Sequence, residues 1–230
     1  MMNKITVNCL IEFFSEEIPA NMQTGLEVQI EEIFKKQLDT KRLKHKNLEI
    51  FSSPRHLAIK INNLQKKQED QIIEIKGPNV NSPNAAIEGF ISSHNVSKDK
   101  LVKKTINKGE FYFLERLDSG RYAFDLIPEM INQLIKNLNW SKSQRWSNTE
   151  IKWGRPLRNI LAIINNKTIK GSFDLGNNEL IYFNNYTFGH RNFNKKILIK
   201  NPENYKEVLK NNGVFVDRIE RQNLIKERLN

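Results

Sequence analysis

The chain of 230 residues carries 37 Lys and Arg against 26 Asp and Glu, which gives a formal net charge of +11 at neutral pH. Its 13 Phe, 5 Tyr and 3 Trp can build a buried core, so the composition excludes an intrinsically disordered chain. The sequence has no run of about 20 uncharged apolar residues and no signal-peptide pattern, so we expect neither a transmembrane helix nor a secretory leader.

The first predicted elements are a strand over 4–14, rich in β-branched and aromatic residues, and a helix over 19–38. In that helix Leu26, Ile30 and Phe34 recur at four-residue steps, so they line one face. Farther along, we expect two strands around the Ser-Ser-Pro turn of 48–64, a strand over 71–77, a short helix over 83–93, a capped turn over 97–101, and two strands over 101–106 and 110–117 joined by a turn at 107–109.

The second half begins with a helix over 124–138, and Pro128 is expected in its first turn because proline costs a backbone hydrogen bond deeper in a helix. Strands and helices mix without βαβ alternation, so the predicted class is α+β, with mixed, mostly antiparallel sheets, packed helices and a charged helix at the end. The remaining elements expected are a hairpin of strands over 160–164 and 167–173, strands within 181–191 and 196–200, and helices over 202–210 and 217–229.

The domain organisation expected from these patterns has three parts. Residues 1–140 form an α+β part, and residues 141–216 form a β-rich part that could belong to the same domain. Residues 217–230 begin a helix without a Gly or Pro stop, which we expect to continue into a missing remainder of a longer protein.

The sequence lacks the common signatures of a self-contained active site. The four histidines show no H-x-x-x-H spacing, and neither nucleotide-binding glycine motif nor a nucleophile elbow is present. The single cysteine, Cys9, excludes an internal disulfide and suits a cytoplasmic setting. We therefore predict no catalytic residue, no metal site and no cofactor bound by this segment.

The excess of basic residues has two interpretations. It favours a polyanionic partner such as nucleic acid, but the many Lys, Asn and Ile also indicate drift in codon composition. Arginine is more informative, because its planar fork grips phosphate and stacks on bases. Arg145 and Arg155 lie close to tryptophans, including Trp146, and either form a phosphate-gripping and stacking surface or pack their stems on a core.

Other clusters also have a functional and a structural interpretation. Glu12, Glu16 and Glu17 could do acid/base work, or stabilise the start of the following helix. The turn of Pro54 and Arg55 could contact phosphate, or only connect two strands. Gly189-His190-Arg191 could bind RNA, or supply a turn whose glycine adopts a backbone angle that other residues resist. Asp217 to Arg221 is expected to cap and pair the last helix.

Read together, these clusters are similar in order and spacing to the N-terminal third of the β subunit of bacterial two-subunit glycyl-tRNA synthetases. That family has the strings E-I-G-T-E-E-L-P, T-P-R-R-L-A, K-G-P, A-x-x-G-F, M-R-W, F-x-R-P and T-x-G-H-R-F. The matching segments here are 12–19, 53–58, 76–78 (with Gly77), 86–90, 144–146, 153–156 and 187–193. One departure is Phe14, which stands where the family has a glycine.

The resemblance implies a subunit of glycine–tRNA ligase whose catalytic site lies on a separate α subunit. The complete enzyme would use glycine, ATP with Mg, and glycine-specific tRNA. This segment would bind tRNA, dock the α subunit, or both, and would also contact the remainder of the β subunit. We expect Arg145, Arg155, His190 and Arg191 to contact RNA. Three alternatives remain open, namely a stand-alone RNA-binding protein, a hydrolase that uses Glu16, Glu17 and His190, and a structural interface domain.

Overall fold

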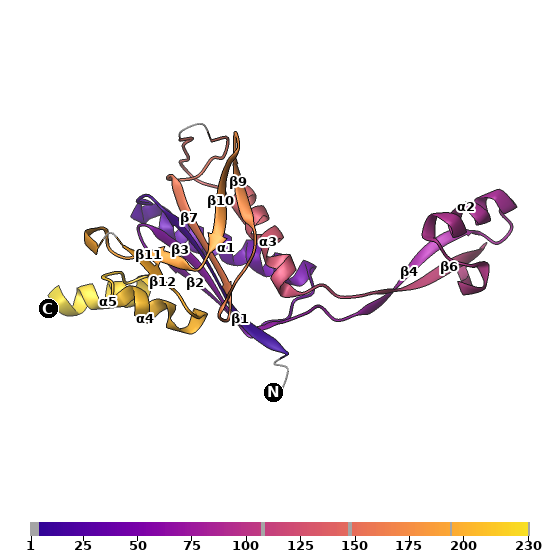
Figure 1. Cartoon of the computed structure of the whole chain (residues 1–230), viewed down its shortest axis with the longest axis horizontal. Coiled ribbons are helices and arrows are strands. Elements are labelled where there is room, and N and C mark those ends of the chain that lie inside the picture. The colour runs from indigo at the N-terminus through magenta and orange to yellow at the C-terminus, as the bar shows by residue number, and fades with distance from the viewer. Residues whose placement is uncertain (1–4, 107–108, 147–148, 194, 230) are drawn as a thin grey trace. The chain divides into compact units, whose positions relative to one another are not determined.

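The computed structural model describes residues 5–106, 109–146, 149–193 and 195–229 (Figure 1). Contacts along the chain divide it into two compact units, the main unit of residues 1–68 and 121–230 and the inserted unit of residues 69–120. The boundaries expected from the sequence at residues 140 and 216 both fall within the main unit. Whether the main unit is subdivided there stays a prediction.

A seven-stranded sheet forms the centre of the main unit. Strand β1 pairs antiparallel with β3 on one side and with β7 on the other, and only the contact of β10 with β7 is parallel. The order along the sheet is β2-β3-β1-β7-β10-β9, with β8 also paired to β7. The strands are β1 (Thr6–Ser15), β2 (Asn47–Ser52), β3 (His56–Gln65), β7 (Leu157–Ile164), β8 (Lys167–Thr168), β9 (Ser172–Gly176) and β10 (Glu179–Asn184).

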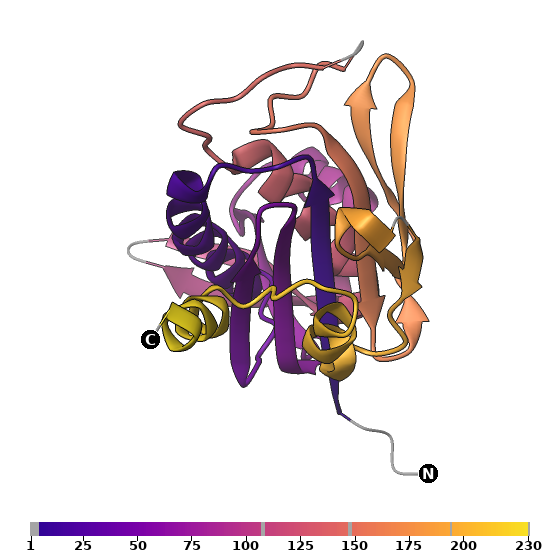
Figure 2. The ribbon, with the colours of Figure 1, turned by 90° about the vertical axis from the view of Figure 1, so that its left-hand side faces the viewer.

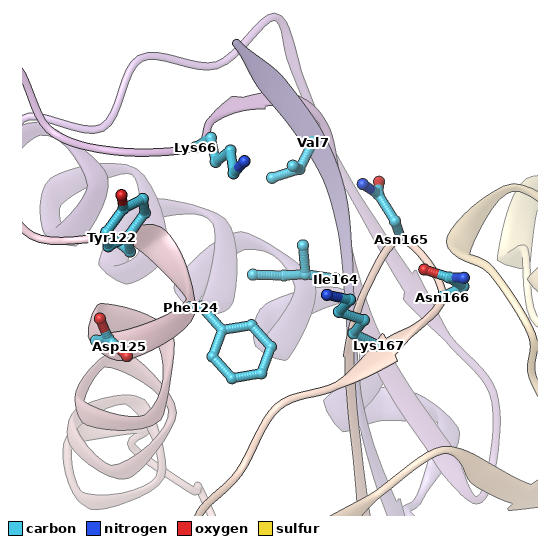
Figure 3. A pocket seen from close by; sticks show the side chains of 9 residues that line it. All are labelled: Val7, Lys66, Tyr122, Phe124, Asp125, Ile164, Asn165, Asn166 and Lys167. Carbon is cyan, nitrogen blue, oxygen red and sulfur yellow. The ribbon is translucent and has the colours of Figure 1, made fainter. Parts of the chain in front are cut away.

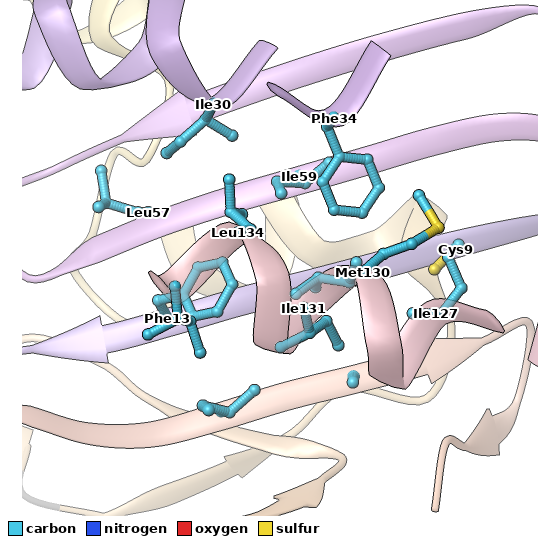
Figure 4. Packing of buried hydrophobic residues seen from close by; sticks show 14 of the residues in the cluster. Cys9, Phe13, Ile30, Phe34, Leu57, Ile59, Ile127, Met130, Ile131 and Leu134 are labelled. Carbon is cyan, nitrogen blue, oxygen red and sulfur yellow. The ribbon is translucent and has the colours of Figure 1, made fainter. Parts of the chain in front are cut away.

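Helices α1 (Ala20–Thr40) and α3 (Ala123–Asn137) cover one face of this sheet. Successive strand residues point to opposite faces, so Phe13 of β1 meets these helices together with every second residue of its strand. Phe34 of α1 and Ile131 of α3 are fully buried against it (Figure 4). The apolar face predicted for the first helix, with Leu26, Ile30 and Phe34, is thus confirmed as its buried face.

The opposite face of the sheet is covered by the last part of the chain. Leu10 of β1 and Leu161 of β7 pack there against Ile197, Tyr205 and Leu209. Figure 2 shows α4 and α5 on the near side of the strands. The elements of this layer are β11 (Tyr186–Phe188), η2 (Arg191–Phe193), β12 (Lys196–Leu198), η3 (Pro202–Asn204), α4 (Tyr205–Lys210) and α5 (Arg218–Leu229).

Two buried titratable side chains join this layer to the sheet. The Glu12 carboxylate of β1 accepts hydrogen bonds from the hydroxyls of Thr187 and Tyr205. Burial raises the pKa of Glu12 to about 7, against the lowering effect of these two hydrogen bonds. His56 Nε2 lies 2.9 Å from the carbonyl oxygen of Phe188. Burial lowers the pKa of His56 to about 4, so the ring is neutral at pH 7.

The inserted unit is a three-stranded antiparallel sheet, ordered β4-β6-β5, with the α-helix α2 and a short 3-10 helix. Gly77 of β4 lies against Phe90, because a Cβ added to Gly77 would come within 2.9 Å of the Phe90 ring. Two of the sequence motifs, K-G-P and A-x-x-G-F, therefore meet in one packing contact. The elements are β4 (Gln71–Asn79), α2 (Asn84–His94), η1 (Lys98–Lys100), β5 (Leu101–Ile106) and β6 (Gly109–Asp118).

The α+β class with mostly antiparallel sheets and a charged final helix is confirmed, and three details differ. Pro128 lies well inside α3, beyond its first turn. The expected strand over 167–173 is only two residues long, and the chain after it pairs with β10. β4 continues past Gly77 through a register shift. The turn expected at 107–109 lies partly outside the described residues.

Among the described residues, no helix is both long and apolar enough to cross a membrane.

The buried carboxyl group makes stability depend on pH. Since the folded chain holds the Glu12 proton up to about pH 7 and the free carboxyl loses it near 4.5, its stabilising contribution is lost as the pH rises between these values. Glu12→Gln removes this titration. We expect the unfolding free energy of the variant, relative to the parent chain, to rise by about 3 kcal/mol from pH 4.5 to 7 in urea titrations.

His56→Gln should show the opposite trend. The folded pKa of His56 is below its ordinary value of 6.5, so this residue contributes stability that grows as the pH rises from about 4 to 6.5. The variant should therefore lose stability relative to the parent over that range. Unfolding curves of either variant that keep a constant offset from the parent at every pH would contradict the assignment.

Candidate nucleic-acid interface

Four loops of the main unit meet at the end of the sheet where β1 finishes. They are the loop that follows β1, the β2–β3 turn, the β11–β12 loop and the α4–α5 loop. The amide of Ser15 donates to the carbonyl of Arg55 at 2.8 Å, which ties the end of β1 to the β2–β3 turn. The amide of His190 donates to the carbonyl of Asn212 at 2.9 Å, which ties the β11–β12 loop to the α4–α5 loop. Backbone hydrogen bonds between distant segments thus fix all four loops.

These loops enclose a pocket of about 230 Å³, named here the arginine pocket. Three guanidinium groups and one carboxylate are among its lining groups, so the charge around it is positive. The lining residues are Glu17, Ser53, Pro54, Arg55, His56, Gly189, His190, Arg191, Gly213, Val214, Phe215 and Arg221.

The arginine at the mouth of the pocket is the most exposed of the three. Arg191 forms an ion pair with Glu17, and their side chains are 65 % and 56 % exposed. Exposed pairs of this kind contribute little to stability, because water screens both charges. A bound anion can therefore replace the Glu17 carboxylate at little cost.

Arg55 and Arg221 are held in the wall. The Arg55 guanidinium lies 4.5 Å from the centre of the Phe14 ring and 3.6 Å from a Glu16 carboxylate oxygen. Arg158 donates to the same carboxylate at 2.9 Å. Arg221 donates to the carbonyl of Phe215 at 2.6 Å and to two further acceptors, on Ser52 and Gln23. The Arg221 guanidinium thus holds the segments of the pocket wall together through these hydrogen bonds.

Two glycines allow the loops to approach this closely. A Cβ on Gly189 would come within 2.7 Å of the carbonyl oxygen of Asn212. Gly213 has a φ of +76°, in the region that favours glycine, and a Cβ there would meet the Phe193 ring at 2.9 Å. Both glycines are therefore required by the packing of the pocket wall.

The Arg/Trp segment takes a different place. Gln144 and Trp153 form an antiparallel bridge, which brings the two expected motifs together. The buried Trp153 ring donates from Nε1 to Ser15 Oγ at 2.9 Å and lies 4.7 Å from the Trp140 ring. The tryptophan therefore supports the end of β1 from within the core.

The arginines of that segment do not line the pocket. Arg155 is partly buried and donates to the carbonyl of Gly154 at 2.7 Å, while Arg145 is exposed and Trp146 is partly buried against the core. Of the expected RNA-contacting residues, the pocket brings together His190 and Arg191. It also brings in four of the family-motif positions, Glu17, Pro54, Arg55 and Gly189.

The acidic residues of the first motif separate in the fold. Glu12 is buried beneath β11, Glu16 pairs with two arginines, and Glu17 lines the pocket beside His190. The hydrolase alternative required Glu16, Glu17 and His190 in one pocket, and Glu16 is not among the lining residues. In the described part of the chain, no three His, Cys, Asp or Glu side chains are grouped as metal ligands.

Sequence reasoning did not place Gly213, Phe215 and Arg221 at this site. Gly213 comes shortly after a predicted helix, where a glycine usually marks the helix end. Its position in the sequence does not indicate which other loop it contacts. Arg221 was expected only as part of the capped and paired last helix. Their meeting with the β2–β3 turn arises from contacts between segments far apart in the chain.

A second hollow, of about 440 Å³, lies at the opposite end of the sheet, next to the start of β1. Lys66, just after β3, and Lys167 of β8 extend over it, and the Tyr122 and Phe124 rings face it (Figure 3). None of the residues expected at a functional site lines this hollow, so the arginine pocket is the better candidate.

Comparison with known proteins identifies one family. A family model described as "Glycyl-tRNA synthetase beta subunit" matches residues 9–230. The glycine–tRNA ligase beta subunit of Rickettsia bellii is 40 % identical over 221 residues, which are 96 % of this chain and 33 % of that protein. The subunit of Rickettsia canadensis is 38 % identical, over 96 % of this chain and 32 % of its own length. The chain thus spans about a third of the curated relatives that it matches.

The glycine at the pocket wall gives a test of the packing. Gly189→Ala forces the 189 and 212 backbones apart, so we expect a loss of about 1–3 kcal/mol in unfolding free energy. Gly25→Ala is the matched control, because a Cβ on Gly25 in α1 meets no atom within 4 Å. It should stabilise the chain by up to about 1 kcal/mol, since alanine is the better helix former. Equal effects in urea unfolding would contradict the close approach at Gly189.

Proposed function

Because the chain belongs to the glycyl-tRNA synthetase beta subunit family, as its motifs predicted, we propose that it supports the ligation of glycine to tRNA without a catalytic site of its own. In this proposal the main unit binds the phosphate backbone of glycine-specific tRNA at the arginine pocket. The complete cytoplasmic enzyme uses ATP with Mg at a catalytic site on a separate α subunit. This chain and the remainder of the β subunit both contribute to binding that α subunit.

The observation that carries the RNA-binding part is the arginine pocket with the exposed His190 and Arg191 at its mouth. The distribution of charge supports it. The inserted unit has seven Lys and Arg against eight Asp and Glu, so the surplus of +11 belongs entirely to the main unit. Phosphate contacts from Lys and Arg provide most of the affinity for RNA and make it depend on salt.

A different observation supports the docking part of the proposal. In the inserted unit Ile72 and Leu117 form a cross-strand pair and are 69 % and 60 % exposed. Apolar pairs on a nearly neutral surface suit a protein partner better than RNA. We assign this surface to the α subunit, and a structural interface domain without RNA binding is the alternative.

The proposal is tested by binding of the chain to glycine tRNA and to an unrelated tRNA, at low and moderate salt, with and without the α subunit. Salt-sensitive binding by the chain alone supports an RNA surface, and a preference for glycine tRNA supports recognition within this segment. Association with the α subunit but not with either tRNA would contradict the RNA-binding part and support the interface alternative.

Neutralising the exposed arginine should remove one phosphate contact. We expect Arg191→Gln to weaken binding to both tRNAs and to reduce the slope of log affinity against log salt by about one. Arg116→Gln makes the same change of charge at an exposed position of the inserted unit and should leave that slope unchanged. An unchanged slope for Arg191→Gln in fluorescence anisotropy would show that Arg191 does not contact phosphate.

The docking surface is tested by removing its apolar groups. The double variant Ile72→Ser and Leu117→Ser should weaken association with the α subunit by about tenfold, because it removes apolar area from the interface. Leu180→Ser, at a leucine of the main unit that is 44 % exposed, is the control and should have no effect. The salt dependence of tRNA binding should be the same in all three proteins. Undiminished association of the double variant would place the docking surface elsewhere.

A further inference from the structure

We propose that the arginine pocket takes a single unpaired nucleobase, and that the Phe193 ring beside it stacks on the neighbouring base. This inference rests on the proposed RNA binding and adds to it a class of ligand. The RNA would present a single-stranded stretch at this point, because a paired and stacked base cannot enter a pocket.

The size of the pocket fits one base. Its volume of about 230 Å³ equals the share of roughly eight water molecules in the liquid. Pockets for drug-sized molecules begin at about 300 Å³. A purine ring therefore fits inside, while its ribose and phosphates remain at the mouth, where Arg191 lies.

The lining of the pocket suits a flat, uncharged ring. Pro54, Val214 and Phe215 supply apolar contacts. The inner polar groups already have partners, since Arg221 donates to Phe215 and His56 contacts Ser53 Oγ at 2.9 Å. The inner end of the pocket therefore does not require a charged ligand, and the exposed Arg191–Glu17 ion pair lies at the mouth.

Phe193 supplies the stacking surface. Its side chain belongs to η2 and is 52 % exposed, although it is a large aromatic ring. It stands edge-on to the His190 ring, with centroids 6.5 Å apart, and packs on Gly213, where a Cβ would clash. Proteins stack unpaired bases on exposed aromatic rings of this kind, and the contacts with His190 and Gly213 fix the position of the Phe193 ring.

Arg191 follows His190 directly and precedes Phe193 by two residues, so one short turn carries the cation, the pocket wall and the ring. The Arg191 ion pair with Glu17 is exposed at both ends, and a phosphate can take the place of the carboxylate. Two successive nucleotides thus meet the apolar pocket with one base, the Phe193 ring with the neighbouring base, and the Arg191 guanidinium with a phosphate.

The test compares two RNA probes on the 230-residue chain. One is a fluorescein-labelled adenosine hexamer, and the other is the same ribose-phosphate hexamer without bases. Phe193→Ala should weaken binding of the adenosine hexamer by about tenfold and leave the abasic hexamer unchanged, because only stacking is lost. Phe193→Tyr keeps an aromatic ring and should restore binding.

Two further variants distinguish contacts with the phosphate from contacts with the base. Arg191→Gln should weaken both hexamers by the same factor, and Glu17→Gln should strengthen both, since it removes the competing carboxylate. Tyr182→Ala is the matched control, because Tyr182 is 68 % exposed and does not line the pocket. It should change neither affinity. Circular dichroism confirms that each variant is folded.

Several results would overturn the inference. Equal affinity of the parent chain for the two hexamers, or an unchanged affinity of Phe193→Ala for the adenosine hexamer, would exclude a base site, and the Arg191 effect would still support phosphate binding. No salt-dependent binding of either hexamer would overturn the proposed RNA binding as well. Loss of α-subunit association in Phe193→Ala, with RNA binding intact, would assign the pocket to a protein side chain.

Discussion

The buried carboxyl group of Glu12 is the contact on which the functional end of the molecule depends. It lies on the central strand and accepts hydrogen bonds from Thr187 of β11 and Tyr205 of α4, so it fastens the C-terminal layer onto the sheet. A buried carboxyl without these partners would be costly. The β11–β12 loop, which carries His190 and Arg191, is positioned because β11 is held at this point.

The same region keeps its charge at the surface. His56 is buried and neutral, and the Arg221 guanidinium donates its hydrogen bonds to carbonyl and amide oxygens of the pocket wall. The Phe14 ring supports the Arg55 guanidinium and packs on Phe188. The result is a pocket whose inner polar groups already have partners and whose mouth carries the exposed Arg191–Glu17 ion pair, and the proposed base and phosphate contacts rest on this arrangement.

Charge is divided between the two units in a way that the total of +11 conceals. The inserted unit is close to neutral and shows exposed aliphatic residues on its strands, whereas the main unit carries the whole surplus. Long-range electrostatic attraction to a polyanion scales with such local surplus. This distribution supports the proposed assignment of RNA binding to the main unit and of protein docking to the inserted unit.

The sequence by itself determined the α+β class, most helices and strands, and the family. Those features depend on local periodicity and on short strings such as 187–193, which are written in adjacent residues. Tertiary structure alone decided that 189–191 meets 53–56 and 212–215, that the expected arginines separate into pocket and non-pocket groups, and that residues 69–120 form a unit of their own. These outcomes depend on hydrogen bonds and packing between segments that can lie more than a hundred residues apart, and such pairings leave no periodic signal in one sequence.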